Sequence, residues 1–275
     1  MCRVLSISRA GYYAWKNRGK SCRGQMDLAL TERIRSIYAE NRKVYGYPRI
    51  HAALISQGVR VGRKRVARLM RVSGIVAEPH RRMHWKRAFK TAKGADNLVQ
   101  RRFNVPEPNR VWAADMTAFW TGSGWVHLAI VMDLFSRRIV GWAMHGQMTE
   151  RLVLDALSMA VLSRRPAGSL IHHSDQGSQY QSHLFRSKLK EYGIQISMSR
   201  RGNCWDNAVV ESFFKTAKAE LQNDARFSSR EVARSELFEY IEVFYNRKRM
   251  HSTLGYLSPA QFESSFPSLV STKTG

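Results

Sequence analysis

The apolar residues in the first third of the chain recur every three or four positions, which is the spacing of a helix that buries one face. Between residues 27 and 77 they form three short runs, separated by Tyr-Gly-Tyr-Pro at positions 45–48 and by Gly58. Gly58 and Gly74 stand where two of the runs end, a position at which glycine commonly closes a helix. Short helix, glycine-containing turn and short helix is the outline of a helix-turn-helix motif. Residues 27–77 are therefore predicted to form an all-α, helix-turn-helix-like DNA-binding domain.

From Val111 the apolar residues alternate with polar ones or form continuous runs, as in half-buried and buried strands. Three runs joined by short turns, over residues 111–120, 125–135 and 138–144, predict an antiparallel meander. The elements predicted after it are a helix beginning at Thr149, a strand over 169–175, a helix over 182–192, a strand over 195–199, a helix containing Glu211 and a last helix over 229–246. Ser228 and Glu231 are expected to form the capping box of that last helix. The order of elements predicts an α/β fold.

Charge divides the chain unevenly. Its formal charge is +24, from 45 Lys and Arg against 21 Asp and Glu, and residues 1–110 hold 26 of the basic residues but only 6 of the acidic ones. A basic front part is typical of a protein that displaces counterions from nucleic acid. The alternatives are a solvated or a membrane-facing surface. A membrane is not expected as a partner, because the chain has neither an apolar run of about 20 residues nor a secretory signal pattern.

The pattern and the charge together predict five segments. They are a basic N-terminal segment over 1–26, whose role stays open, the helical domain over 27–77, a basic linker over 78–110, a catalytic core over 111–265 and a tail over 266–275. The linker contains Arg81 and Arg82 in a charge run with interleaved aromatic residues. Blocks of like charge repel and stay extended, so we expect a linker that also clamps DNA, the alternative being a solvated basic linker.

Three carboxylates stand where a metal-dependent enzyme acting on phosphodiesters would need them. Asp115 lies inside an apolar run of strand length, Asp175 ends another, and Glu211 belongs to a predicted helix. Mg²⁺ prefers oxygen ligands and is commonly held by one or two carboxylates together with phosphate oxygens and water. Two such ions about 4 Å apart can stabilise the attacking and leaving oxygens of a displacement at phosphorus. The alternative is that the three carboxylates occur by chance in a chain of this size. The sequence motifs around them help to decide between the two.

The spacing of these carboxylates and the sequences around them resemble a known family. Asp175 and Glu211 are 36 positions apart, so 35 residues lie between them, and Lys218 follows Glu211 by seven positions. The flanking motifs are His-Ser-Asp-Gln-Gly-Ser-Gln-Tyr at 173–180, Gly-Asn-Cys-Trp-Asp-Asn-Ala at 202–208 and Tyr-Asn-Arg-Lys-Arg-Met-His-Ser-Thr-Leu-Gly-Tyr-Leu-Ser-Pro at 245–259. Together they resemble the second-frame (OrfB) transposases of bacterial insertion sequences, whose retroviral-integrase-like core belongs to the Asp-Asp-Glu superfamily. The resemblance runs from about Ser8 to Phe262.

The resemblance implies a ribonuclease H-like integrase core and a DNA transposase that cleaves strands at insertion-sequence ends and transfers them to a target. It implies that Asp115, Asp175 and Glu211 are the catalytic residues and hold Mg²⁺ or Mn²⁺, with two ions expected. The implied partners are double-stranded DNA of the element's ends and of the target, further copies of the chain, and a first-frame (OrfA) product, separate or fused. The implied location is the bacterial cytoplasm, with the nucleoid.

Two other functions are compatible with the same residues: a ribonuclease H-like metal nuclease, and a catalytically silent DNA-binding regulator. The basic helical front part argues against a bare nuclease, and the intact set of three carboxylates argues against a silent regulator.

Candidate DNA-binding residues lie on two predicted helices. On the helix over 62–71, apolar residues face inward while Arg63, Lys64, Arg65 and Arg68 lie on other faces, so this helix could enter a major groove. The alternative is a packed three-helix spacer whose arginines face water.

On the second helix, Asn207, Lys215 and Lys218 share the face of Glu211 at spacings of four and seven positions. The two lysines are expected to hold phosphates near the metal. For Lys215, a surface salt bridge with Glu211 is the alternative.

Other polar residues are less suited to the site. Asp133 ends the second predicted strand and is expected to have a structural role, and Asp206 and Glu220 lack the spacing of Glu211. One of the neighbouring His172 and His173 is expected in the core. The three cysteines are scattered, so neither a disulfide framework nor a zinc site is predicted.

Overall fold

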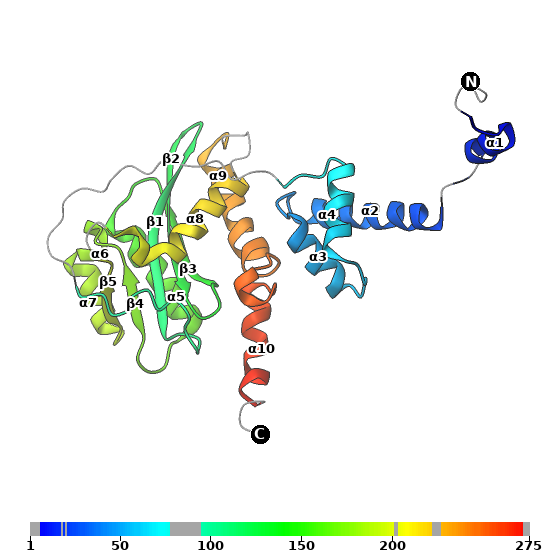
Figure 1. Ribbon diagram of the computed structural model, residues 1–275. Helices are drawn as coiled ribbons and strands as arrows, with labels where there is room; N and C mark the ends of the chain where they lie inside the picture. The colour runs from blue at the N-terminus through cyan, green and yellow to red at the C-terminus, as the bar shows by residue number, and fades with distance from the viewer. Residues whose placement is uncertain are drawn as a thin grey trace. The chain divides into compact units, whose positions relative to one another are not determined.

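A computed structural model of the chain describes residues 6–17, 19, 21–77, 95–200, 203–221 and 227–271 (Figure 1). The chain divides into two compact units, residues 1–77 and 78–275, which are described separately. Within the described ranges, no helix is both long enough and apolar enough to cross a lipid bilayer.

The first unit is all helical, as the apolar periodicity predicted. Its helices are α1 (Arg9–Asn17), α2 (Cys22–Glu40), α3 (Tyr47–Ser56) and α4 (Arg63–Val72). Ile34, Leu54 and Val66 are fully buried in the core that joins α2, α3 and α4. Gly58 and Gly74 follow α3 and α4 with φ angles of 78° and 65°, a left-handed conformation that glycine adopts without steric cost. The prediction of short helices closed by glycines is confirmed.

The second unit is built on a five-stranded sheet (Figure 1). Its strands are β1 (Val111–Thr121), β2 (Gly124–Asp133), β3 (Ile139–His145), β4 (Ile171–Ser174) and β5 (Gln195–Met198). Their order across the sheet is β3-β2-β1-β4-β5. The first three strands pair antiparallel, whereas β1, β4 and β5 are parallel. The predicted meander is therefore confirmed, and helices make the crossovers that parallel strands require.

Helices cover both faces of this sheet. On one face lie α5 (Glu150–Arg164), α6 (Ser178–Gln181) and α7 (His183–Glu191), and on the other lie the 3-10 helix η1 (Cys204–Asn207), α8 (Ala208–Leu221) and α9 (Arg230–Phe238). Gly141 of β3 lets α5 approach closely, because a Cβ there would overlap the carbonyl oxygen of Ala156. On the opposite face, the ring of Trp142 packs edge-on against Phe238 of α9, with 5.9 Å between centroids.

The start of α9 corrects one predicted detail. The cap is Ser229, whose Oγ accepts a hydrogen bond from the N–H of Val232 at 3.3 Å, so the predicted capping box of Ser228 with Glu231 is wrong. Either serine could have been the cap on sequence alone. The helix continues from α9 into a π-helical segment, η2 (Glu239–Tyr245).

Residues 95–110 were predicted, from the charge of the sequence, to belong to the basic linker. In the structure they pack against the sheet unit. Val99 and Val105 are buried. The N–H of Leu98 donates to Oγ of Ser197 at 2.9 Å, which attaches this segment to β5. Residues 78–94, with Arg81 and Arg82, lie outside the described residues.

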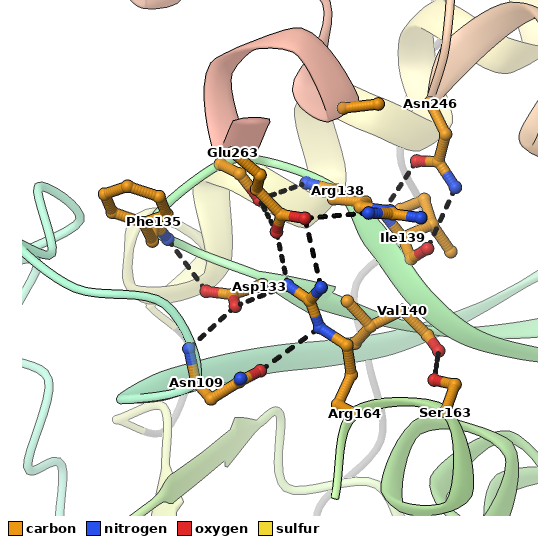
Figure 2. Close-up of polar contacts among 12 residues, drawn as sticks. Asn109, Asp133, Phe135, Arg138, Ile139, Val140, Ser163, Arg164, Asn246 and Glu263 are labelled. Carbon is orange, nitrogen blue, oxygen red and sulfur yellow. Dashed lines mark hydrogen bonds and ion pairs between the residues drawn. The ribbon is translucent and has the colours of Figure 1, made fainter. Parts of the chain in front are cut away.

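An ion-pair network joins β2, α5 and the last helix, α10 (Pro259–Ser271) (Figure 2). Arg164, at the end of α5, pairs with both Asp133 and Glu263, and Glu263 also pairs with Arg138 at 2.8 Å. Burial by itself would raise the pKa of Glu263, but the bonds from the two arginines hold it below its ordinary value. Asp133 is fully buried and accepts the N–H of Asn109 at 2.8 Å. The structural role expected of Asp133 is confirmed.

No helix was predicted after residue 246, although the chain carries a signal for α10. Oγ of Ser258 accepts the N–H of Gln261 at 3.3 Å, and the N–H of Ser258 donates to Oε1 of Gln261 at 3.0 Å. This reciprocal pair is a capping box, and Pro259 occupies the first helical position, where its missing N–H costs nothing. The short η3 (Ser252–Leu254) precedes it.

A second buried ion pair connects the end of α8 to the segment after η2. The side chains of Arg249 and Glu220 are 5% and 1% exposed, and Nη2 of Arg249 lies 2.7 Å from Oε1 of Glu220. The hydroxyl of Tyr240 donates to the same carboxylate at 2.7 Å. Nearby, the side-chain amide of Asn246 bonds both the N–H and the carbonyl of Ile139, each at 2.9 Å, as a neighbouring strand would.

Breaking this pair from one side tests its contribution. Arg249→Met leaves the Glu220 carboxylate buried without its cation, and we expect a loss of about 3–5 kcal/mol in the free energy of unfolding. Arg247→Met, a change of the same type at an exposed position two residues away, should alter it by less than about 0.5 kcal/mol. Urea denaturation measures both. Equal losses in the two variants would contradict a special contribution from the Arg249–Glu220 pair.

Candidate active site

The pairing of β1 with β4 brings Asp115 and Asp175 together. The two strands are parallel, with Ala113 opposite His173. Two residues further along each strand direction come Asp115, inside β1, and Asp175, directly after β4. Side chains two positions apart point to the same face, and neighbouring strands lie about 4.8 Å apart. The register therefore places these carboxylates side by side on one face of the sheet.

Helix α8 carries Glu211 along the same face of β1. At its start, Nδ2 of Asn207 donates to the carbonyl oxygen of Ala114 at 3.1 Å, next to Asp115 in the chain. Further along, Nζ of Lys218 lies 5.6 Å from the centroid of the Phe119 ring. Glu211 is one turn after Asn207, so these two contacts hold its turn of the helix over Asp115.

The three carboxylates influence one another electrostatically. The pKa of Asp115 is raised well above its ordinary value, first by burial and then by the charges of Asp175 and Glu211, while Lys218 opposes the rise. Burial raises the pKa of Asp175. Burial and the charge of Asp175 raise the pKa of Glu211. The site is therefore a half-buried group of acids that a bound cation would stabilise.

Backbone donors orient two of these carboxylates. Oδ1 of Asp115 accepts the N–H of Met116 at 2.7 Å, and Oδ1 of Asp175 accepts the N–H of Gly177 at 3.0 Å. Across the described ranges, no three His, Cys, Asp or Glu side chains are grouped closely enough to hold a metal ion, so the acids would have to draw together to share one. Their chemistry suits a hard cation, since all three offer carboxylate oxygens.

A buried histidine fixes the strand that carries Asp175. Nδ1 of His173 lies 2.8 Å from Oγ of Ser197, and Nε2 lies 3.0 Å from the carbonyl oxygen of Asp206 and 3.2 Å from Oγ of Ser199. This ring therefore ties β4 to β5 and to η1, which leads into α8. His172 is buried on the other face, where burial first lowers its pKa, to about 3. Both histidines lie in the core, whereas only one was expected there.

The rival carboxylates have other partners. Asp206 accepts the side chains of Arg200 and Arg101, each at 2.9 Å. The bond from Arg200 is the largest of several effects that hold the pKa of Asp206 well below its ordinary value. Glu220 belongs to the Arg249 pair. Both of these carboxylates are therefore paired with arginine.

The structure separates the candidates on α8. Asn207 is 4% exposed, and its amide serves the backbone of β1. Lys218 is half-buried, and burial lowers its pKa while the charge of Asp115 opposes that change. Lys215 is exposed, and within the part of the chain that the structure describes it makes no ion pair.

On α4 an acid that sequence reasoning overlooked holds two of the four candidates. Oδ1 of Asp27 accepts Nε of Arg65 at 2.7 Å, and Oδ2 accepts Nη2 of Arg68 at 2.5 Å. Both bonds lower the pKa of Asp27, that from Arg68 most. Arg63 and Lys64 are exposed at the start of α4. The available signal was that Asp27 is the first acidic residue of a strongly basic front part.

The mixed five-stranded sheet with helices on both faces has the fold of an integrase catalytic core. The family model described as Integrase core domain matches residues 105–204, a second model of that description matches 192–259, and HTH-like domain matches 25–83.

Similar proteins make the family explicit. The transposase for insertion sequence element IS904 of Lactococcus lactis is 44% identical over 238 residues, covering 85% of this chain and 93% of that protein. Transposase InsF for insertion sequence IS3A of Escherichia coli is 39% identical over 269 residues, covering 96% and 93%. The chain belongs to the family of insertion-sequence transposases. The HTLV-2 integrase catalytic core domain, solved in complex with magnesium, is 16% identical with a TM-score of 0.41 and covers 56% of this chain and 96% of that one. The resemblance and fold class expected from the sequence are confirmed.

The repulsion among the acids predicts an effect on stability without any DNA. In EDTA, Asp115→Asn should raise the melting temperature, because it removes one of the three mutually repelling charges. In Mg²⁺ the wild-type protein should gain stability through binding, and the variant should gain much less. Calorimetry in both buffers measures this. A variant that is less stable in EDTA, yet gains as much as the wild type from Mg²⁺, would contradict the assignment.

Proposed function

We propose that this transposase cuts a DNA strand at the end of its insertion sequence and joins the freed end to target DNA. Water attacks the phosphorus and a 3′-oxygen leaves; the resulting 3′-hydroxyl then attacks a target phosphodiester, whose own 3′-oxygen leaves. The meeting of Asp115 and Asp175 on paired strands, beside Glu211, is the observation that carries the proposal. These three residues are its catalytic Asp-Asp-Glu set, which makes the protein a polynucleotidyl transferase.

Asp115, Asp175 and Glu211 would hold Mg²⁺ or Mn²⁺, as two ions. Such ions, when bound, stabilise charge on the attacking and leaving oxygens. The protein's own contribution is orientation. Backbone N–H groups fix one oxygen of each aspartate, and the Asn207 amide fixes the start of α8 against β1.

Lys218 supplies a positive charge beside the acids. Its half-buried ammonium lies against the Phe119 ring and in the field of Asp115, so it is placed to hold a DNA phosphate. Lysine is a compact charge on a flexible stem, which suits a phosphate whose position changes between cleavage and joining. Lys215, exposed one turn after Glu211, would extend this contact along the DNA backbone.

The helical unit would bind the element's double-stranded ends through α4. Arg63 and Lys64 are exposed and would reach phosphates, whereas Asp27 orients Arg65 and Arg68 and offsets part of their charge. Arg81 and Arg82 would add contacts along the linker. Further copies of the chain and a first-frame product would complete the assembly on end and target DNA.

Strand cleavage and joining test the catalytic assignment. Asp115→Asn should abolish Mg²⁺-dependent cleavage of labelled end DNA, because an amide supplies no negative charge to the ions, while DNA binding stays near wild type. Asp155→Asn is the matched control, since Asp155 lies on α5 and pairs with Arg151. A pre-cut end tests joining directly. Cleavage retained by Asp115→Asn would sink the catalytic assignment, and a wild-type chain that cleaves but never joins, even with its first-frame partner, would be a nuclease.

The salt dependence of binding tests α4. Each phosphate contact contributes about 0.9 to the slope of log affinity against log salt concentration, so Arg63→Ala with Lys64→Ala should flatten the slope by about 1.8. Fluorescence anisotropy of the full chain with duplex end DNA measures it. Arg33→Ala with Arg35→Ala removes the same charge from exposed positions of α2 and should change the slope less. If the two double variants behave alike, α4 makes no special contact.

A further inference from the structure

Tyr180 has a buried hydroxyl that core packing does not explain. The residue is 1% exposed, and its hydroxyl has no hydrogen-bond partner among the described residues. Its ring packs against those of His172 and Phe185, with centroids 6.1 and 5.4 Å away. A buried polar group without a partner costs about 1–3 kcal/mol. Phenylalanine would fill the same space without that cost.

The ring lies against the turn that carries Asp175. A Cβ on Gly177 would lie 3.0 Å from Oδ1 of Asp175 and 3.6 Å from Cδ2 of Tyr180, so one small residue separates the carboxylate from the ring. Burial, and then the charges of Asp115 and Asp175, raise the pKa of Tyr180 well above its ordinary value. The phenol therefore stays protonated at neutral pH, and it lies in the field of both aspartates.

Carboxylates that hold a metal ion are ionised, and ionised carboxylate oxygens only accept hydrogen bonds, so a protonated hydroxyl beside them acts as the donor. In metal sites, a carboxylate ligand is commonly held by a hydrogen bond from a neighbouring group, which fixes its orientation. Among the described residues, the bonds to these aspartates come from the backbone N–H groups of Met116 and Gly177. The Tyr180 hydroxyl would add a third hydrogen-bond donor to these aspartates when they move together to share a metal ion.

We propose that Tyr180 is a positioning residue of the cation site, and that its hydroxyl donates a hydrogen bond to Asp115 or Asp175 when the two share a metal ion. The inference rests on the proposed function, because it requires the cation site. The proposal also explains why the Tyr180 hydroxyl has no hydrogen-bond partner among the described residues. Its partner would be an aspartate that binds the metal ion.

Mn²⁺ binding by calorimetry, without DNA and without turnover, tests this. Tyr180→Phe should weaken Mn²⁺ binding about 10-fold, the lower end of the effect of removing such a supporting bond. Its melting temperature in EDTA should equal or exceed that of the wild type, since the lost hydroxyl had no partner. Tyr240→Phe is the opposite control: it loses the bond to Glu220 and should melt lower, with Mn²⁺ affinity unchanged.

Other outcomes would overturn either the inference about Tyr180 or the cation site itself. Wild-type Mn²⁺ affinity in Tyr180→Phe overturns the inference alone. If that variant also melts lower, the hydroxyl makes a bond inside the core, for example to His172, whose ring centroid lies 6.1 Å from that of Tyr180. Tyr180→Met, which also lacks the hydroxyl and adapts its shape to the space, provides the same comparison if the phenylalanine variant does not fold. If the wild type shows no Mn²⁺ binding that depends on Asp115 and Asp175, the cation site itself fails.

Discussion

The parallel pairing of β1 with β4 is the constraint on which the rest of the site depends. It joins two segments that are far apart in the sequence, and its register sets Asp115 beside Asp175. A slip of one residue would turn one carboxylate to the opposite face of the sheet. His173 resists such a slip, because its ring bonds β5 and the chain that leads into α8 at the same time. One buried imidazole thus couples the position of Asp175 to that of Glu211.

The partners of the buried carboxylates distinguish the site from the rest of the core. Asp133, Asp206, Glu220 and Glu263 are each paired with arginine, as a buried carboxylate must be to offset its loss of hydration. Asp115, Asp175 and Glu211 instead face one another, with Lys218 the nearby cation that opposes the rise in the pKa of Asp115. Perturbed acids left without ion-pair partners are typical of functional sites rather than of structural networks. Among the described residues, the four other acids thus have arginine partners, whereas this group has none, as the proposed cation site would require.

The local sequence pattern predicted the helices and strands well, but it did not predict which distant residues contact one another. The meander, the crossover helices and the three short front helices follow from periodicity and glycine positions, and the carboxylates follow from spacing and resemblance. The pairing of Asp27 with Arg65 and Arg68, the packing of residues 95–110 on the core and the burial of Asn207 did not follow, because each depends on residues distant in the sequence. The helix α10 was not predicted, although its capping box of Ser258 with Gln261 is local in the sequence. Tyr180 belongs to one of the sequence motifs, but only the structure shows that its hydroxyl is buried and has no hydrogen-bond partner among the described residues.

We propose that three carboxylates converge on a cation, with the two aspartates placed by one strand register. Anomalous diffraction from crystals of the protein soaked in Mn²⁺ tests it most directly. We expect an Mn²⁺ peak bound by oxygens of both Asp115 and Asp175, at about 2.0–2.2 Å as for other small divalent ions, with Glu211 turned toward it or toward a second peak beside it. A fully occupied Mn²⁺ elsewhere on the protein, with Asp115 and Asp175 still apart and free of metal, would contradict the account.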